Sequence, residues 1–265
     1  MTTVDKHEPG TFCWAELSTT DIEAGRGFYE SLFGWKGAAQ PAGEMGEYVV
    51  FSLADGRPAA GGYEQPEQER SMGFPPHWNL YIYSDDVDKT VAKSVEAGGK
   101  AVVQPMDTPN GRMAVVADPT GAIFCLWQSD SMPGWAVRDE PGSFSWPELI
   151  SNDVDRAAKF YSDVFDWTVR QESMGDGPPY TLFHQGDRDV GGAFPPPMPD
   201  IPNYWNVYFD VSSAADTVAK AKKLGGDVLQ EPMEIPDVGT FAVMVDPTKA
   251  VFAILEAKPG GRVAE

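Results

Sequence analysis

Cysteine and histidine are both scarce in this chain of 265 residues. It has two cysteines, Cys13 and Cys125, and three histidines, His7, His77 and His184. Two cysteines cannot build a disulfide framework, and no CxxC pairs indicate a zinc cluster, so the composition suits a reducing cytoplasm. Any centre that needs several histidines must use those three. We expect His7, in a polar N-terminal stretch, to lie in solvent.

Positive charge and long apolar runs are also lacking. Twenty basic residues stand against 40 acidic ones, a formal net charge of −20, so we expect no nucleic-acid partner. No run of 18 apolar residues occurs, and the first ten residues show no basic segment followed by an apolar one. We therefore expect no membrane association, no standard export signal and a cytoplasmic location.

What the chain does contain is a long internal repeat. Residues 10–35 align without gaps to residues 142–167, with ten identities in 26 positions. Residues 78–106 align to residues 205–233, with 11 identities in 29 positions, and the sequence DPT recurs once in each half. The offset stays close to 130 residues, which indicates a tandem duplication.

The repeat predicts two related domains, residues 8–130 and residues 140–258. The stretch between them, 129–141, combines proline, glycine and mixed charge, which suits a boundary. Alternating apolar residues predict strands, and a spacing near 3.6 predicts helices. In the first half this gives strands at 12–18, 48–53, 58–63, 78–83, 101–104, 113–117 and 122–127, and helices at 21–33 and 86–97. The predicted fold class is α+β, with four βαβββ units, two in each domain.

This order of motifs resembles the vicinal oxygen chelate superfamily, which groups glyoxalase I, bleomycin-resistance proteins, fosfomycin-resistance enzymes and extradiol dioxygenases. The resemblance rests on the first helix with Asp21, Phe28, Tyr29, Phe33 and Trp35, on the GG pair after the second helix, and on the DPTG turn before the last strand. It is nearest to tandem actinobacterial glyoxalase-like proteins, several of them labelled hydroxylases. The resemblance implies that each pair of units curls into a cup.

The resemblance also implies where a metal is held, namely by His or Glu on the first and last strands of each unit. The corresponding residues here are Trp14, Asn79 and Cys125, repeated as Trp146, Asn206 and Ala253. These side chains lack the imidazole and carboxylate groups that such metals prefer. We expect His77 and His184 to be surface or rim residues. The prediction is therefore a protein with no metal and no cofactor.

Strand alternation predicts which side chains face the cups. They are Trp14, Glu16, Asn79, Tyr81, Tyr83, Cys125 and Trp127 in the first half, and Trp146, Glu148, Asn206, Tyr208, Asp210 and Leu255 in the second. As substrate-binding candidates we take Trp14, Glu16, Asn79, Tyr81, Cys125, Trp127, Trp146, Glu148, Asn206 and Tyr208. Aromatic walls with few polar groups are typical of a pocket for a planar, partly apolar small molecule. Ordinary core packing is the alternative interpretation.

Glu16 and Glu148 occupy equivalent mid-strand positions and are the candidate catalytic residues. Burial in an aromatic cup destabilises the ionised carboxylate, which raises its pKa toward that of a general base. In the alternative, an indole N–H or an arginine such as Arg112 pairs with the glutamate and holds two strands in register. Cys125 has no activating neighbour in the sequence pattern, so we interpret it as a small buried apolar residue.

Two proline-rich segments, 64–76 and 194–203, join the units of each half. One interpretation is a stiff connector. The other is a rim that gates the pocket, with Met72, Phe74 and Met198 as adaptable apolar contacts.

Three functions are open from the sequence. The first is metal-independent binding of a small aromatic or polyketide-like metabolite, which the protein sequesters or acts on. The second is catalysis, as a glyoxalase-like lyase or isomerase, or as an antibiotic-tailoring hydroxylase or oxygenase with an atypical site. The third is a protein-interaction module. The oligomeric state, and whether units pair within or between halves, are open as well.

Overall fold

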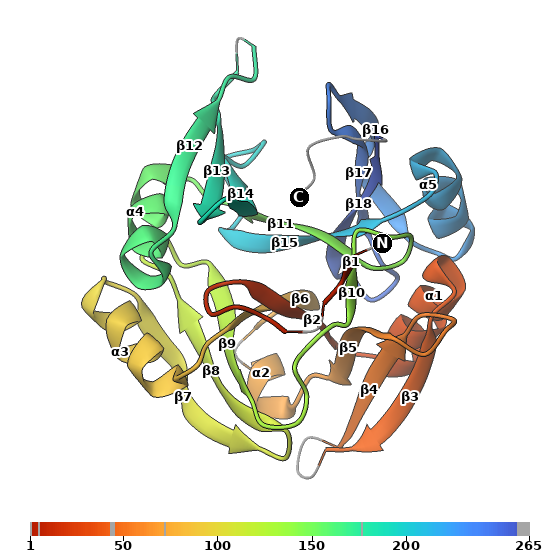
Figure 1. The fold of residues 1–265 in the computed structure, drawn as a ribbon. Coiled ribbons are helices and arrows are strands. Elements are labelled where there is room, and N and C mark those ends of the chain that lie inside the picture. The colour runs from red at the N-terminus through yellow and green to blue at the C-terminus, as the bar shows by residue number, and fades with distance from the viewer. Residues whose placement is uncertain (1, 5, 43–45, 72, 176, 259–265) are drawn as a thin grey trace.

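The chain folds into two β-sheets, one built mainly from each half, in a computed structural model that describes all residues except 1, 5, 43–45, 72, 176 and 259–265 (Figure 1). The first sheet contains β2 (Phe12–Thr19), β3 (Lys36–Pro41), β4 (Glu47–Ser52), β5 (Pro58–Glu64), β6 (His77–Tyr83), β7 (Lys100–Thr108), β8 (Gly111–Ala117) and β9 (Ile123–Ser129). The second contains β1 (Thr2–Thr3), β10 (Val137–Arg138), β11 (Phe144–Ile150), β12 (Thr168–Glu172), β13 (Tyr180–Gln185), β14 (Arg188–Phe194), β15 (Tyr204–Asp210), β16 (Asp227–Ile235), β17 (Gly239–Val245) and β18 (Val251–Ala257). The helices are α1 (Ile22–Phe33), α2 (Glu67–Ser71), α3 (Val87–Glu96), α4 (Val154–Phe165) and α5 (Ala214–Lys223).

The two units of each half pair with one another. The first sheet has the order β3-β4-β5-β2-β6-β9-β8-β7. Its centre is the antiparallel pair of β2 and β6, while β5 and β9 join them as parallel neighbours. The second half repeats this pattern around β11 and β15. Each half therefore curls into its own cup, and the predicted α+β fold of βαβββ units is confirmed.

The sequence-based prediction lacks β3 and α2. β3 reads KGAAQP and forms a sheet edge whose side chains are mostly exposed, so it carries no alternating apolar pattern. α2 reads EQERS and buries none of its residues. Neither element has the periodic apolar face by which strands and helices are recognised in a sequence.

The four longer helices begin at side-chain caps and lie on the two flanks of the molecule. Asp21, Asp86, Asp153 and Ser213 each accept a hydrogen bond from a backbone N–H in the first turn of their helix. α1 contacts α5 on one flank and α3 contacts α4 on the other, so each flank combines one helix from each half (Figure 1). No helix in the described part of the chain is long and apolar enough to span a membrane.

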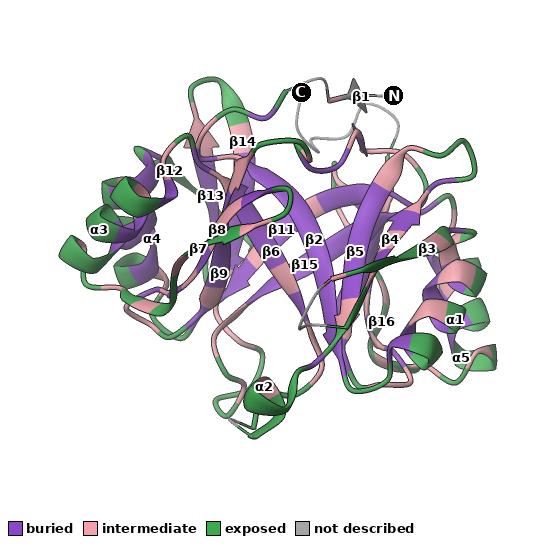
Figure 2. Ribbon diagram, turned by 90° about the horizontal axis from the view of Figure 1, so that it is seen from below, coloured by how far each residue is buried: buried purple, intermediate pink, exposed green. Residues whose placement is uncertain are grey.

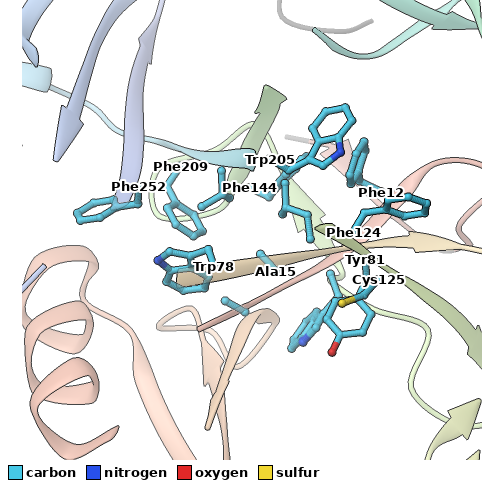
Figure 3. Close-up of a cluster of buried hydrophobic side chains, with 14 of the residues drawn as sticks. Phe12, Ala15, Trp78, Tyr81, Phe124, Cys125, Phe144, Trp205, Phe209 and Phe252 are labelled. Carbon is cyan, nitrogen blue, oxygen red and sulfur yellow. The ribbon is translucent and has the colours of Figure 1, made fainter. Parts of the chain in front are cut away.

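One continuous apolar core joins the two sheets back to back. Trp78 packs edge-on against Phe209 with ring centroids 5.1 Å apart, and Phe12 against Trp205 at 4.9 Å (Figure 3). Buried residues are concentrated along β2, β6, β11 and β15, whereas α2 is exposed (Figure 2). With their backs in contact, the two cups open on opposite sides of the molecule (Figure 1).

The recurring DPT turns anchor hydrogen bonds that cross between the halves. Tyr29 on α1 donates to Asp246 Oδ2 of the second half (3.0 Å), and its oxygen accepts from Trp78 Nε1 (3.0 Å). In the mirrored arrangement, Tyr161 on α4 donates to Asp118 Oδ2 of the first half (3.1 Å). Each aspartate also binds the backbone of its own turn, so the turn holds the chain reversal and the partner helix together.

The expectation that His7 lies in solvent is wrong. Its side chain is 5% exposed, and Nε2 lies 3.1 Å from the carbonyl oxygen of Trp135 in the segment between the halves. Burial is the main cause that lowers the pKa of His7. The N-terminal stretch returns across that segment, where β1 pairs with β10, and this long-range contact has no local sequence signal.

Candidate functional site

The floor of the first cup is formed by β2, β5 and β6. Glu16 lies in the middle of β2, with Gly61 of β5 and Asn79 of β6 as its register partners. Trp14 points to the same side two residues earlier, as alternation predicts, and Leu17 faces the helices. Glu16 is 8% exposed, so a carboxylate is buried at the centre of this floor.

A chain of hydrogen bonds crosses the floor. The indole N–H of Trp14 donates to the hydroxyl of Tyr48 (2.8 Å), and Tyr81 donates to Glu16 Oε1 (2.8 Å). Tyr48 is also hydrogen-bonded to Glu16. Because an indole nitrogen only donates, the Tyr48 oxygen accepts the hydrogen bond from Trp14. The Tyr48 hydroxyl in turn donates its hydrogen bond to the Glu16 carboxylate. Glu16 therefore accepts hydrogen bonds from two phenols.

These surroundings raise the pKa of the Glu16 carboxyl group. Burial raises its pKa from 4.5 to about 7, and the nearby Glu69 carboxylate adds to the rise, while the hydrogen bonds from Tyr81 and Tyr48 oppose it. Burial also raises the pKa of both tyrosines well above 10, so they remain donors. A carboxyl group with such a pKa exchanges its proton near neutral pH.

The second cup repeats the arrangement. Trp146 donates to the hydroxyl of Tyr180 (2.9 Å), and Tyr208 donates to Glu148 Oε2 (2.7 Å). Burial raises the pKa of Glu148, while hydrogen bonds from Tyr208 and Tyr180 oppose the rise. Asn206 is the register partner of Glu148.

A glycine beside each glutamate makes room for the tyrosine. At Gly61 an added Cβ would lie 1.9 Å from the hydroxyl oxygen of Tyr48, and at Gly192 it would lie 2.1 Å from that of Tyr180. Any side chain there would displace the phenol. The bare strand therefore lets each tyrosine reach across β5 or β14 to the floor.

The two cups differ in how far they are covered. Trp14 and Glu16 are buried, whereas Trp146 and Glu148 are only half-buried. Helix α2 lies between the two arms of the first sheet (Figure 1), and the matching segment of the second half forms no helix.

The proposed rim residues are exposed where the structure describes them. Phe74 is 37% exposed and Met198 is 63% exposed, while Met72 lies outside the described residues. The segment 64–76 of the first half contains helix α2. The interpretation of this segment as a stiff connector is therefore incomplete.

The remaining first-half candidates line the wall of their cup. Cys125 is the register partner of Tyr81, and burial raises its thiol pKa well above the usual value. Trp127 stands edge-on to Tyr81 with centroids 6.4 Å apart and donates to the carbonyl oxygen of Met132. Asn79 contacts the hydroxyl of Tyr63.

In the second half, two further predicted cup residues lie in different places. Leu255 packs with Tyr208, as expected for a wall residue. Asp210, in contrast, lies beneath the segment between the halves, where burial and the neighbouring carboxylates of Asp139 and Glu140 raise its pKa to about 6. Its backbone N–H donates to Ser143.

The arginine hypothesis for Glu16 is wrong. Arg112 forms ion pairs with Asp88 (2.7 Å) and Asp107 (2.6 Å) on the outer face of its strand. No indole donates directly to Glu16 either, because Trp14 reaches it only through Tyr48. The group on the neighbouring strand that donates to Glu16 is the phenol of Tyr81.

Sequence reasoning missed Tyr48 and Tyr180, the central members of both hydrogen-bond chains. The available signal was their separation of 132 residues, the same offset that relates Trp14 to Trp146 and Glu16 to Glu148. Glu69 was also missed, because nothing in a polar connector marks one carboxylate as pointing inward.

Comparison with known protein families agrees with the presence of two similar cups in the chain. Residues 11–126 and 143–254 match the family model described as the Glyoxalase/Bleomycin resistance protein/Dioxygenase superfamily. The chain belongs to this superfamily. Solved members share the fold: the Mn(II)-bound glyoxalase from Novosphingobium aromaticivorans has a TM-score of 0.63 at 19% identity, covering 94% of this chain and 82% of its own. The 2,3-dioxygenase LapB from Pseudomonas sp. KL28 has a TM-score of 0.66 at 13% identity, covering 96% and 94%.

Curated members of the superfamily align over nearly the whole chain. One, named "Putative glyoxylase CFP32" in Mycobacterium tuberculosis, is 40% identical over 255 residues, which is 96% of this chain and 97% of that protein. Another, "Anthracycline biosynthesis protein DnrV" of Streptomyces peucetius, is 33% identical over 264 residues, 95% of each. Both alignments therefore span the two halves of this chain.

The side chains at the superfamily's metal-holding positions do not fit a divalent cation. Trp14 donates to a tyrosine, and Cys125 is a buried thiol whose raised pKa keeps it protonated. His77 lies two residues before Asn79 on the same face of β6, with its Nε2 3.1 Å from Asn79 Oδ1, and His184 pairs with Asp189. Among the described residues, no group of three or more His, Cys, Asp or Glu side chains is placed to hold a metal ion. The floor carboxylates bind phenols instead.

Proposed function

We propose that the protein binds a small, planar, partly apolar molecule of aromatic or polyketide-like chemistry in a cup, without a metal ion. The observation that carries this proposal is the glutamate held by tyrosines on each cup floor, beside positions whose side chains, such as Trp14 and Cys125, do not fit a metal ion. Indole and phenol rings offer flat apolar surface with polar edges. The name of the relative DnrV, which refers to anthracyclines, supports a planar polycyclic class of ligand.

The second cup is the more accessible of the two. Trp146 and Glu148 are half-buried on its floor, and Phe241 and Val243 form an apolar wall beside Tyr208. Asn206 is 2% exposed, and its Oδ1 has no hydrogen-bond partner among the described groups. An unpaired buried acceptor beside an aromatic wall suits a ligand that carries a hydroxyl donor.

Thermal unfolding with hydroxyanthraquinone probes tests the proposal. A ligand at about 100 times its Kd raises the free energy of unfolding by about 2.7 kcal/mol. We expect such a shift, insensitive to EDTA, and we expect Trp146→Ala to remove most of it. Leu229→Ala, at a 61% exposed position on β16, is the control and should leave the shift unchanged. If no probe stabilises the protein, or if chelation abolishes the shift, metal-independent binding is contradicted.

A second candidate function is proton transfer at the cup floor, as in a lyase or isomerase. The observation that favours it is the pKa of about 7 at Glu16, which suits a general base near neutral pH. With the methylglyoxal–glutathione adduct as the substrate, we expect turnover to fall at least about 100-fold in a Glu16→Gln, Glu148→Gln double variant. Retained thermal shifts in that variant would separate lost chemistry from lost binding. Turnover that survives both substitutions excludes these glutamates as bases.

A further inference from the structure

A carboxylate of the protein itself lies over the floor of the first cup. Glu69 of α2 accepts from Ser18 Oγ at 2.7 Å and from the hydroxyl of Tyr63 at 3.1 Å. His77 Nε2 lies 3.8 Å from the same carboxylate, and Gln65 Nε2 is 3.5 Å away. The side chain of Glu69 is 19% exposed although its helix lies at the surface.

The groups that hold Glu69 belong mostly to the sheet. Ser18 of β2 is flanked in register by Tyr63 of β5 and His77 of β6, so the three form one row across the central strands. They stay in place whether or not α2 covers them, because each is fixed by its own strand. The hydroxyls of Ser18 and Tyr63, with the His77 imidazole beside them, are therefore a preformed site for an anionic oxygen.

The second half provides a natural comparison. There the row consists of Ile150, flanked by Phe194 and Tyr204. The hydroxyl of serine, the phenol of Tyr63 and the imidazole are thus replaced by two apolar groups and a phenol. The segment corresponding to α2 is the proline-rich stretch 194–203, which contains no glutamate. The counterparts of Ser18 and Tyr63 in the second cup are thus apolar, and Asp200, the carboxylate of its connecting segment, is exposed.

Helix α2 is weakly attached apart from Glu69. It has five residues, none of them buried, and an isolated turn of this length is unstable in water. Arg70 of α2 pairs with Glu64 and Glu67 on the exposed surface. The contact through Glu69 is therefore the main inward attachment of this helix.

We propose that the first cup binds a planar molecule bearing a carboxylate, which replaces the Glu69 carboxylate on the hydroxyls of Ser18 and Tyr63 while α2 moves aside. The inference rests on the proposed function of the cups and adds the ligand class for one of them. Exchange of one carboxylate for another keeps every donor paired, so no buried group is left unsatisfied. Glu69 then acts as a tethered competitor that lowers the apparent affinity.

The test compares anthraquinone-2-carboxylate with its neutral carboxamide, using the full chain with Trp146→Ala so that the first cup dominates binding. Adding Glu69→Ala should tighten carboxylate binding about tenfold, because the competitor is gone. Ser18→Ala with Tyr63→Phe should then abolish the preference for the acid over the amide. Glu67→Ala, an 84% exposed position on the same helix, should change neither affinity.

Movement of α2 gives an independent readout. Tryptic cleavage after Arg70 should accelerate when the carboxylate probe is added. Equal affinity for acid and amide in the Glu69→Ala chain, or an affinity unaffected by that substitution, overturns the proposal. The proposed function itself is judged in the second cup with neutral probes and intact Trp146, so the two can fail separately.

Discussion

Glu16→Gln is expected to be more stable than the wild-type protein above pH 7, by roughly 3 kcal/mol, and nearly equal to it below pH 4.5. The folded pKa of Glu16 is about 7 against 4.5 in the unfolded chain. Because the folded state holds this proton more tightly, its stabilising contribution is complete below about pH 4.5 and is lost as pH rises through 7. A difference of about 2.5 pKa units corresponds to roughly 3 kcal/mol. Glutamine keeps the shape and never ionises.

Urea denaturation of both proteins at pH 5 and pH 8 measures this effect. The two proteins must be compared at each pH, because Asp210 also has a raised pKa, of about 6. Its ionisation makes the free energy of unfolding fall with rising pH in both proteins. Glu148→Gln is the matched control, and a smaller gain is expected because its carboxylate is half-buried. A wild-type advantage at pH 8 would show that ionised Glu16 is stabilised by its phenols more strongly than burial penalises it.

Asp118→Ala is expected to lower the free energy of unfolding by about 3–5 kcal/mol. Its Oδ1 accepts from the backbone N–H groups of Thr120, Gly121 and Ala122 and from the Thr120 hydroxyl, and its Oδ2 accepts from Tyr161. Alanine removes the acceptor of the Thr120 and Ala122 N–H groups and of the Thr120 and Tyr161 hydroxyls, whereas the Gly121 N–H keeps the backbone carbonyl oxygen of residue 118. Because Tyr161 belongs to the other half, the loss also weakens the junction between the halves.

Tyr161→Phe separates the two contributions. It removes only the bond across the halves and the acceptor for Trp205 Nε1, so a smaller loss of about 1–3 kcal/mol is expected. Denaturant titration followed by tryptophan fluorescence measures both variants, and Asp246→Ala should match Asp118→Ala. An Asp118→Ala loss below that of Tyr161→Phe would show that the turn relaxes and finds other partners.

Much of the fold was predictable because its signals are local. The repeat fixed the equivalence of the halves, and the alternation along residues 12–18 placed Trp14 and Glu16 on the cup side. Asp21 marked the start of the first helix, where its carboxylate caps Ala24 N–H. These features depend on spacing within a few residues, which a single sequence contains.

The site itself was only partly predictable because its contacts are distant in the chain. Tyr48 meets Glu16 because Gly61, on a third strand, leaves space between them. Arg112 forms ion pairs with two nearby aspartates and not with a glutamate of the cup. His7 is buried by a segment more than 100 residues away in the sequence. Glu69 points inward because of donors on β2 and β5, which the composition of α2 does not reveal.

The shared flanks and the common core have a consequence for how this protein could change over time. Each half presents Trp78 or Trp205 and its neighbouring rings to the other half, and each helix flank needs a partner from the other half. Neither half could be deleted without exposing that surface to water. The two halves thus resemble the subunits of a dimer joined into one chain. Substitutions in one cup can therefore alter its ligand specificity while the other half still covers the shared apolar surface.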